Sequence, residues 1–205
     1  GMINGMPYLN FLSPGLLIST AMFAATYECT FGAMVRMTME KVYSALIVTP
    51  LTVEEIVAGE ILWGMTRCLF SGMIMLVVLF LFGIPSWQAI FLMPVLWLAV
   101  GFLFSSLGIL MTSFAPNFDF FTYYFELFIT PMFFFSGIFL PLGKMPGVVK
   151  IIADFLPLTH AVNISRAFIV GELPENMLLD FLVILIPAFG IFIWALHQMK
   201  KRLIK

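Results

Sequence analysis

The chain has 205 residues, of which 62% are hydrophobic and only 10% are charged, and its formal net charge is −1. Soluble domains carry about 25% charged residues, so this composition excludes a soluble globular protein, and the absence of a basic excess excludes nucleic acid as a partner. The apolar runs extend for roughly twenty residues without alternation, which predicts spanning helices and not barrel strands. The predicted fold class is therefore an all-α integral membrane protein, a polytopic helix bundle.

Five apolar stretches are long enough to cross a bilayer. After a mildly polar start at residues 1–12, they cover residues 13–34, 60–82, 88–114, 120–140 and 177–196. Ser13-Pro14 is a typical helix start for the first span, and Gly72, Gly101 and Gly108 are expected to permit close helix packing. Residues 141–176 form a longer segment outside the membrane, between the fourth span and the fifth.

Charge gathers in the connection between the first two spans, at residues 34–59. Its charged side chains are Arg36, Glu40, Lys41, Glu54 and Glu55. Pro50 should end any preceding helix, and Thr52 followed by Glu55 has the S/T-x-x-E form of a capping box. Val53 and Ile56 lie three residues apart, on one helical face. We therefore predict a short amphipathic helix beside the membrane, separate from the second span.

The basic residues predict the orientation. Six fall on the side of the 34–59 connection: Arg36, Lys41, Lys200, Lys201, Arg202 and Lys205. Three fall on the other side: Lys144, Lys150 and Arg166. The excess places the connection and the C-terminus in the cytoplasm, and the N-terminus outside. Because a chain rarely starts outside without a signal sequence, we expect one further spanning helix before Gly1, which makes the domain N-terminally incomplete.

Four ionisable side chains inside the spans are candidates for a translocation path: Glu28, Glu60, Arg67 and Glu126. A charge at the centre of a spanning helix costs roughly 2.5–3.5 kcal/mol, so such residues usually face a bundle interior or a watery cavity. Each also has a structural interpretation. Glu28 is close enough to the cytoplasmic edge to snorkel, and Glu60 and Arg67 share a face but are too far apart to pair directly, which favours a role near the interface. Glu126 is equally compatible with lining a path and with bonding a neighbouring helix.

The chain shows no chemistry of its own. It has no G-x-S-x-G, H-E-x-x-H or Walker A motif, and His160 has no second ligand at metal-binding spacing. Cys29 and Cys68 both fall in apolar runs. We expect no catalytic site, metal site or bound cofactor, so the energy for any transport must come from a partner.

Four segments, taken in order and spacing, resemble the ABC-2 type membrane permeases. They are SPGLLISTAMFAATYECTFGAMVRM, ALIVTPLTVEEIVAGEILWG, TSFAPNFDFFTYYFELFITPMFFFSGIFLPLGKMP and FLPLTHAVNISR. Within that family they resemble the nodulation-protein J branch, which is linked to lipo-oligosaccharide export. The resemblance covers nearly the whole chain and is more specific to the family than to the branch.

The resemblance implies a six-helix permease in the cytoplasmic (inner) membrane that acts as a homodimer with two ATP-binding subunits, ATP being bound only by those partners. It implies one permease domain over residues 1–205, export of an amphiphilic cargo such as a lipo-oligosaccharide or another glycolipid, and an interfacial outer segment after the fourth span. It also implies a stretch that couples to the ATPase: Thr49, Pro50, Leu51, Thr52, Glu54, Glu55 and Ile56.

Other functions remain open. An ABC-2 drug or multidrug exporter would differ only in cargo, and a non-transporting membrane assembly module would need no cargo. A lipid-modifying enzyme is disfavoured because no pair of catalytic carboxylates or histidines lies at a common interface. A proton-driven transporter is disfavoured because it needs more buried ionisable groups or an inverted repeat.

Overall fold

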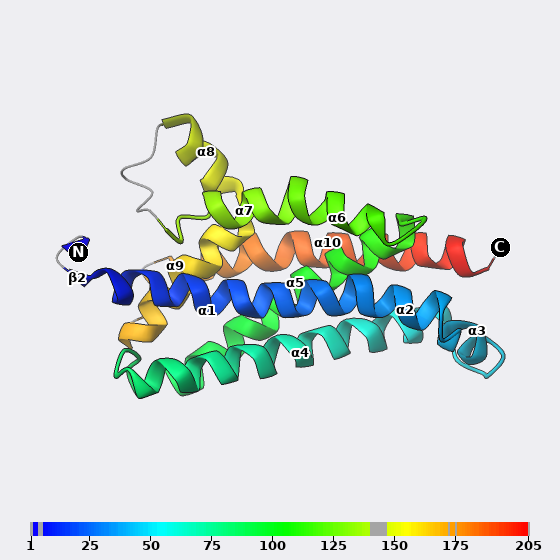
Figure 1. Ribbon diagram of the computed structural model, residues 1–205, viewed down its shortest axis with the longest axis horizontal. Coiled ribbons are helices and arrows are strands. Elements are labelled where there is room, and N and C mark those ends of the chain that lie inside the picture. Colours follow the sequence, from blue (N-terminus) through cyan, green and yellow to red (C-terminus); the bar gives the residue numbers. More distant parts are fainter. Residues whose placement is uncertain (1, 4–5, 140–146, 172, 175, 205) are drawn as a thin grey trace.

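The computed structural model describes residues 2–3, 6–139, 147–171, 173–174 and 176–204. They form a bundle of long helices that run along one common direction, with the two termini at opposite ends (Figure 1). Four helices of the described residues are long and apolar enough to cross a membrane: Tyr8–Thr38, Val53–Leu81, Ala89–Phe114 and Met177–Leu203. The predicted all-α membrane fold is confirmed, apart from two paired two-residue strands, β1 (Met2–Ile3) and β2 (Met6–Pro7).

The first long helix contains a change of winding. It consists of α1 (Tyr8–Tyr27), a π-helical turn η1 (Glu28–Gly32) and α2 (Ala33–Thr38). The other three long helices are α4 (Val53–Leu81), α5 (Ala89–Phe114) and α10 (Met177–Leu203). The shorter helices are α3 (Val42–Ile47), α6 (Asp119–Tyr124), η2 (Phe125–Ile129), α7 (Thr130–Phe135), α8 (Gly147–Phe155) and α9 (Pro157–Val170).

The first span was predicted to begin at Ser13. In the structure α1 begins at Tyr8, and Pro14 lies inside it. Proline has no N–H and so cannot bond the carbonyl of Asn10, yet spanning helices tolerate proline where neighbours compensate. The Ser165 hydroxyl of α9 donates to the carbonyl of Pro14 itself, and not to that of Asn10, at 3.1 Å, so this bond joins α9 to α1. The proline therefore marks a contact between two helices and not a helix start.

The predicted fourth span, 120–140, is shorter in the structure. Helix is continuous over 119–135 as α6, η2 and α7, and it runs from the α3 end of the bundle back toward the N-terminal end (Figure 1). It falls below the length of the four spanning helices, and residue 140 lies outside the described residues. The prediction of five spans therefore counted one short helix among the long ones.

The segment predicted to lie outside the membrane contains α8 and α9. Helix α9 packs against α1, α5 and α10 and buries Leu158, Ile164 and Phe168, so it is part of the bundle. Residues 141–146 of this segment, which include Lys144, lie outside the described residues, as do residues 172 and 175.

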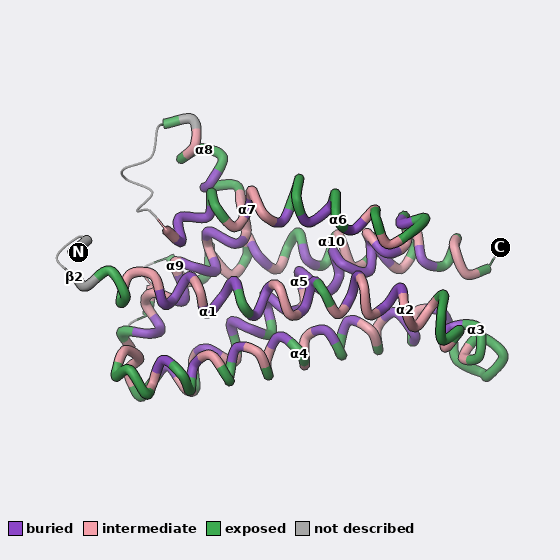
Figure 2. Tube along the Cα trace, viewed as in Figure 1, coloured by how far each residue is buried: buried purple, intermediate pink, exposed green. Residues whose placement is uncertain are grey.

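Helix α5 lies at the centre of the bundle. It packs against α1, α4, α9 and α10. Of its most apolar 18 residues, 61% are buried, whereas only 11% of the corresponding stretch of α10 are buried. Figure 2 shows the buried positions on the inner faces of the helices and the exposed ones on the outside. The outward side chains of α10 include Ile186, Phe189 and Ile193, which is the surface expected to meet lipid.

Close contacts to glycine hold α5 against its neighbours, as predicted. A Cβ added at Gly72 would lie 2.5 Å from the Trp97 ring, and one at Gly101 would lie 3.1 Å from Met65 and Cys68. At Gly108 the added Cβ would lie 2.8 Å from the Cβ of Cys29 and 3.3 Å from its carbonyl carbon. The backbones of α5 and η1 can approach this closely because Gly108 has no side chain.

Replacing Gly108 by valine is expected to destabilise the protein by about 1–3 kcal/mol, because the added methyl groups must push η1 away from α5. Thermal unfolding of the purified protein in mild detergent measures the loss. Gly190→Val on α10 is the matched control, since no atom lies within 4 Å of a Cβ added there. Equal melting temperatures for the two variants would show that the α5–η1 contact is not tightly packed.

Candidate functional site

The start of α4 is the connection predicted to couple to a partner. Its capping box is confirmed, because the Glu55 N–H donates to the Thr52 hydroxyl at 3.3 Å and the Thr52 N–H donates to the Glu55 carboxylate at 2.7 Å. The prediction of a separate amphipathic helix at 53–57 is wrong, since these residues form the first turns of the 29-residue α4. The helix that begins at Val53 continues without a break into the second span. The short separate helix of this connection is α3, which lies before residues 48–51.

Most of the predicted coupling residues already have partners within the chain. Ile56 is buried, Glu55 belongs to the capping box, and the Glu54 carboxylate pairs with Lys200 of α10 at 2.7 Å. The exposed part is residues 48–51, between α3 and α4, which we name the 48–51 tip. Val48 is 86% exposed and Leu51 is 44% exposed, so this tip offers an apolar surface.

Tyr43 fixes α3 under the tip. Its side chain is 1% exposed and belongs to the buried cluster that includes Ile56 and Val57 of α4. Burial, and then the nearby Glu60 carboxylate, raises the pKa of the Tyr43 hydroxyl well above its usual range, so the phenol stays neutral. The tip is therefore connected to α4 through packed side chains and not only through the backbone.

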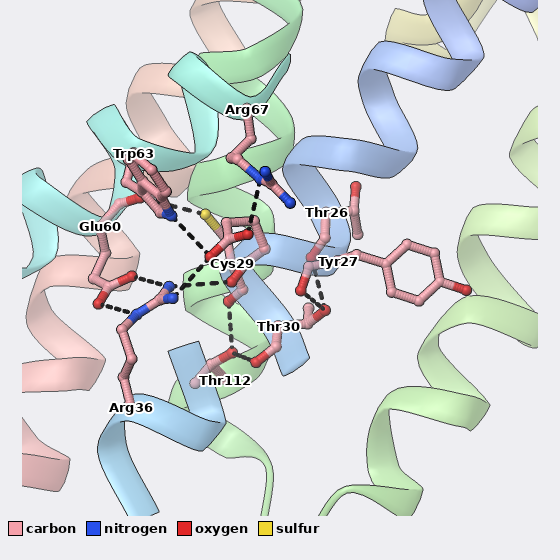
Figure 3. A network of polar contacts seen from close by, with 10 residues as sticks. Thr26, Tyr27, Cys29, Thr30, Arg36, Glu60, Trp63, Arg67 and Thr112 are labelled. Atoms are coloured by element: carbon pink, nitrogen blue, oxygen red, sulfur yellow. Dashed lines mark hydrogen bonds and ion pairs between the residues drawn. The ribbon is translucent and has the colours of Figure 1, made fainter. Parts of the chain in front are cut away.

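A polar cluster lies where η1 and α2 face α4 (Figure 3). We give this name to Glu28, Arg36, Glu60, Trp63 and Arg67. The centre is Arg36, whose Nε and Nη2 donate to the two oxygens of Glu60 at 2.9 and 2.6 Å. Its Nη1 donates to Glu28 Oε1 at 2.7 Å. The contact between Arg36 and Glu60 is therefore bidentate, which is the strongest geometry for a guanidinium and a carboxylate.

Glu28 is the second centre of the polar cluster. Its Oε1 also accepts from the Trp63 indole N–H at 2.8 Å, and its Oε2 lies 3.2 Å from Nε of Arg67. The Glu28 and Glu60 side chains are only 15% and 11% exposed, while Arg67 is 55% exposed. Two acidic and two basic side chains thus form a neutral group that is open on the Arg67 side.

The π-helical turn gives Glu28 its place. Glu28 is the first residue of η1, and the wider turn changes which carbonyls find helical partners. The Thr112 hydroxyl of α5 donates to the Cys29 carbonyl at 2.8 Å, so the irregular backbone is satisfied from a neighbouring helix. Such π-turns often occur at functional sites.

Two cavities adjoin the polar cluster. One, of about 530 Å³, lies toward the tip and is lined by Arg36, Glu60, Trp63 and Leu51, among others. The other, of about 380 Å³, lies between α1 and α4, and its lining includes Glu28, Arg67, Tyr27, Phe70 and Ile74. The second cavity therefore combines a polar end with an apolar wall, which suits a molecule with a polar head and an alkyl chain.

The structure thus brings together three of the four predicted path residues: Glu28, Glu60 and Arg67. As predicted, Glu60 and Arg67 do not pair directly, and each instead contacts a residue of the first helix. Glu126 lies apart from them, exposed on η2, and forms no ion pair with any described residue. The sequence interpretation left Arg36 out of the site because it fell in the predicted loop.

His160 has a structural role that the sequence did not reveal. One ring nitrogen, Nδ1, lies 2.6 Å from the Asp180 carboxylate of α10, and the other, Nε2, lies 2.9 Å from the Asp154 carbonyl of α8. This histidine therefore joins α8, α9 and α10 at the end of the bundle opposite the tip. Among the described residues, no three His, Cys, Asp or Glu side chains gather closely enough to hold a metal ion.

Comparison with known proteins identifies the family. The family model described as ABC-2 type transporter matches residues 1–170. The chain belongs to the ABC-2 type transporter family. It is a multi-pass membrane permease, and members of this family are in general transport subunits that work with an ATP-binding partner.

Several curated relatives of this ABC-2 permease cover its length. It is 32% identical to Nodulation protein J of Sinorhizobium fredii and 34% identical to Nodulation protein J of Rhizobium leguminosarum bv. viciae, in both cases over all of this chain and 78% and 79% of the relative. It is 29% identical to the Inner membrane transport permease YadH of Escherichia coli, over 97% of this chain and 78% of the relative. No solved structure matches the chain.

Proposed function

We infer that this ABC-2 permease exports an amphiphilic molecule across the cytoplasmic membrane, driven by ATP that a separate subunit hydrolyses. The observation that carries the proposal is the arrangement at the α3 end of the bundle. An exposed apolar tip leads into α4. Helix α4 is bonded to the first helix through the half-buried polar cluster, which lies next to a cavity with one polar end and one apolar wall.

Movement would pass from the tip to the cavity through packed elements. A push on the 48–51 tip acts on Thr52, where α4 begins, and on Tyr43, which anchors α3. Glu60 lies two turns further along α4 and is held by Arg36 at 2.6 Å. A tilt of α4 therefore pulls on the first helix and changes the cavity between α1 and α4. This is an element that a partner can bias, which is what coupling requires.

The cargo proposed is a glycolipid or lipo-oligosaccharide. The polar head would contact Glu28 and Arg67, and the alkyl chain would lie against Phe70 and Ile74, which line the same cavity. Support for this cargo comes from the Nodulation protein J relatives and from the mixed lining of the cavity.

The proposed topology follows the charges. Figure 1 places α3 and the C-terminus at one end of the bundle, and the basic side chains of that end include Arg36, Lys41, Lys200, Lys201 and Arg202. The positive-inside rule assigns this end to the cytoplasm, where an ATPase would be found. A homodimer of permeases with two ATPase subunits, as the family resemblance implies, completes the proposed assembly.

Co-purification tests the proposal. The intact protein would be solubilised gently from its native membrane, and we expect a stoichiometric ATP-binding subunit to accompany it. The complex, reconstituted in vesicles, should hydrolyse ATP faster in the presence of glycolipid and should move a labelled glycolipid to the other leaflet. If no ATPase accompanies the permease in several mild detergents, the ATP-driven account is wrong. If drugs and not glycolipids stimulate hydrolysis, the cargo assignment is wrong.

A further inference from the structure

Arg166 is a half-buried cation with few partners among the described residues. It lies on α9, at the end of the bundle where the N-terminus is found (Figure 1). One nitrogen, Nη2, donates to the Gly137 carbonyl at 2.6 Å, and the guanidinium lies 4.2 Å from the centre of the Phe11 ring. The Nε–H is buried without a hydrogen-bond partner. No Asp or Glu among the described residues forms an ion pair with it.

The charge of the Arg166 guanidinium would be stabilised by a bound anion. A guanidinium has five donors, and a buried charge is costly unless it is paired. Burial lowers the pKa of Arg166 to about 10, which still leaves it charged at neutral pH. One carbonyl and one aromatic face leave most of its donors without a partner among the residues that the structure describes.

A small cavity lies against the guanidinium. Its volume is about 130 Å³, its lining includes Asn10, Phe11, Ile84 and Val170 besides Arg166, and none of the lining residues that the structure describes is acidic. Liquid water occupies about 30 Å³ per molecule, so the space holds a group a few times that size, such as a phosphate. The Ser86 N–H donates to the Ile169 carbonyl at 2.7 Å, which ties the turn before α5 to α9, so the cavity walls are fixed in position.

The cavity rim is apolar. Besides Asn10 and Arg166, its described lining consists of Phe11, Pro14, Ile84, Ile169 and Val170, and Val170 is 59% exposed. A ligand bound here would therefore have a charged group at Arg166 and apolar parts over these side chains. A free inorganic ion would leave this apolar rim uncovered.

We propose that the cavity between α1, α9 and the turn before α5 binds the phosphodiester of an anionic membrane lipid, with Arg166 as its cation. The two non-bridging oxygens of a phosphodiester match the planar fork of a guanidinium, and the acyl chains cover the apolar rim. The headgroup is anionic and not zwitterionic, because none of the described residues that line the cavity is acidic and could receive a headgroup ammonium. This lipid is a resident of the structure at the end away from the polar cluster, so the inference is separate from the proposed cargo.

The test measures stabilisation by added lipid. Intact protein, delipidated in a neutral detergent, would be mixed with short-chain phosphatidylglycerol, short-chain phosphatidylcholine or inorganic phosphate, and its melting temperature measured. We expect phosphatidylglycerol to raise the melting temperature by about 5 °C or more, and the other two to raise it by less than a third of that. An equal effect of inorganic phosphate or of phosphatidylcholine would overturn the assignment to an anionic lipid.

Two variants locate the effect. Arg166→Gln should abolish the shift, while Lys150→Gln, which removes an exposed charge on α8, should keep it. If Arg166→Gln fails to fold, Val170→Trp decides, because it fills the cavity from a half-exposed position and leaves the cation in place. A phosphatidylglycerol shift that survives in Val170→Trp would overturn the proposal, and a lost shift in a folded Val170→Trp protein would support it.

Discussion

Replacing Arg36 by methionine is expected to destabilise this permease strongly. The substitution leaves the Glu28 and Glu60 carboxylates without their main partner, and their side chains are only 15% and 11% exposed. Removing one member of a fully buried ion pair costs about 3–5 kcal/mol, because the other charge stays buried and unpaired. These carboxylates are half-buried and Glu28 keeps Trp63 and Arg67, so we expect a loss near the lower end, about 3 kcal/mol. For a chain of this size that corresponds to a fall in melting temperature on the order of 10 °C.

A rescue distinguishes the charge effect from lost packing. Adding Glu28→Gln and Glu60→Gln to Arg36→Met removes the unpaired charges, so we expect most of the stability to return. Lys201→Met is the control, since that side chain is exposed at the same end of the bundle and its loss should leave the melting temperature within about 2 °C. A triple variant as unstable as Arg36→Met would mean that Arg36 acts through its packing and not through its charge.

The long helices were predictable because a helix that spans a membrane needs about 20 consecutive apolar residues, and such a run is visible in the sequence itself. The cap at Thr52 was also predictable, since its partner Glu55 is local. The boundaries were less predictable. Pro14 was interpreted as a helix start, yet it lies inside α1, which begins at Tyr8, and its carbonyl accepts a hydrogen bond from Ser165 of α9, far away in the sequence. The fourth span was predicted to reach residue 140 from hydropathy alone, which does not show that the helix ends at Phe135.

The candidate site could be predicted only in part. Glu28, Glu60 and Arg67 were found because ionisable residues are rare in spans, but nothing local indicates that they meet. Arg36, the common partner of Glu28 and Glu60, lies 8 residues after the first and 24 before the second, and it is reached through the packing of two helices. Opposite charges at the facing ends of two successive spans were a usable signal, and the sequence interpretation did not use it.

The second large effect is expected at the 48–51 tip. Changing Val48 and Leu51 together to aspartate should weaken binding of the ATPase subunit about 30-fold, because interface anchors typically contribute 2 kcal/mol or more and 1.4 kcal/mol is a factor of ten. Val48 is 86% exposed and Leu51 is 44% exposed, so the permease itself should lose little stability. Affinity measured with purified ATPase, beside the melting temperature of the permease alone, separates the two effects.

The choice of residues follows from the partners seen in the structure. Reversing Glu54 and Glu55 is a weaker test, because Glu54 pairs with Lys200 at 2.7 Å and Glu55 caps α4, so a loss of binding would also reflect a disturbed helix start. Met39→Glu is the matched control, since Met39 is 67% exposed on the same connection but outside the tip. If Met39→Glu weakens the ATPase as much as the tip variant, docking depends on the whole connection. If neither change weakens it, the tip is not the coupling surface, and the push must enter the permease elsewhere.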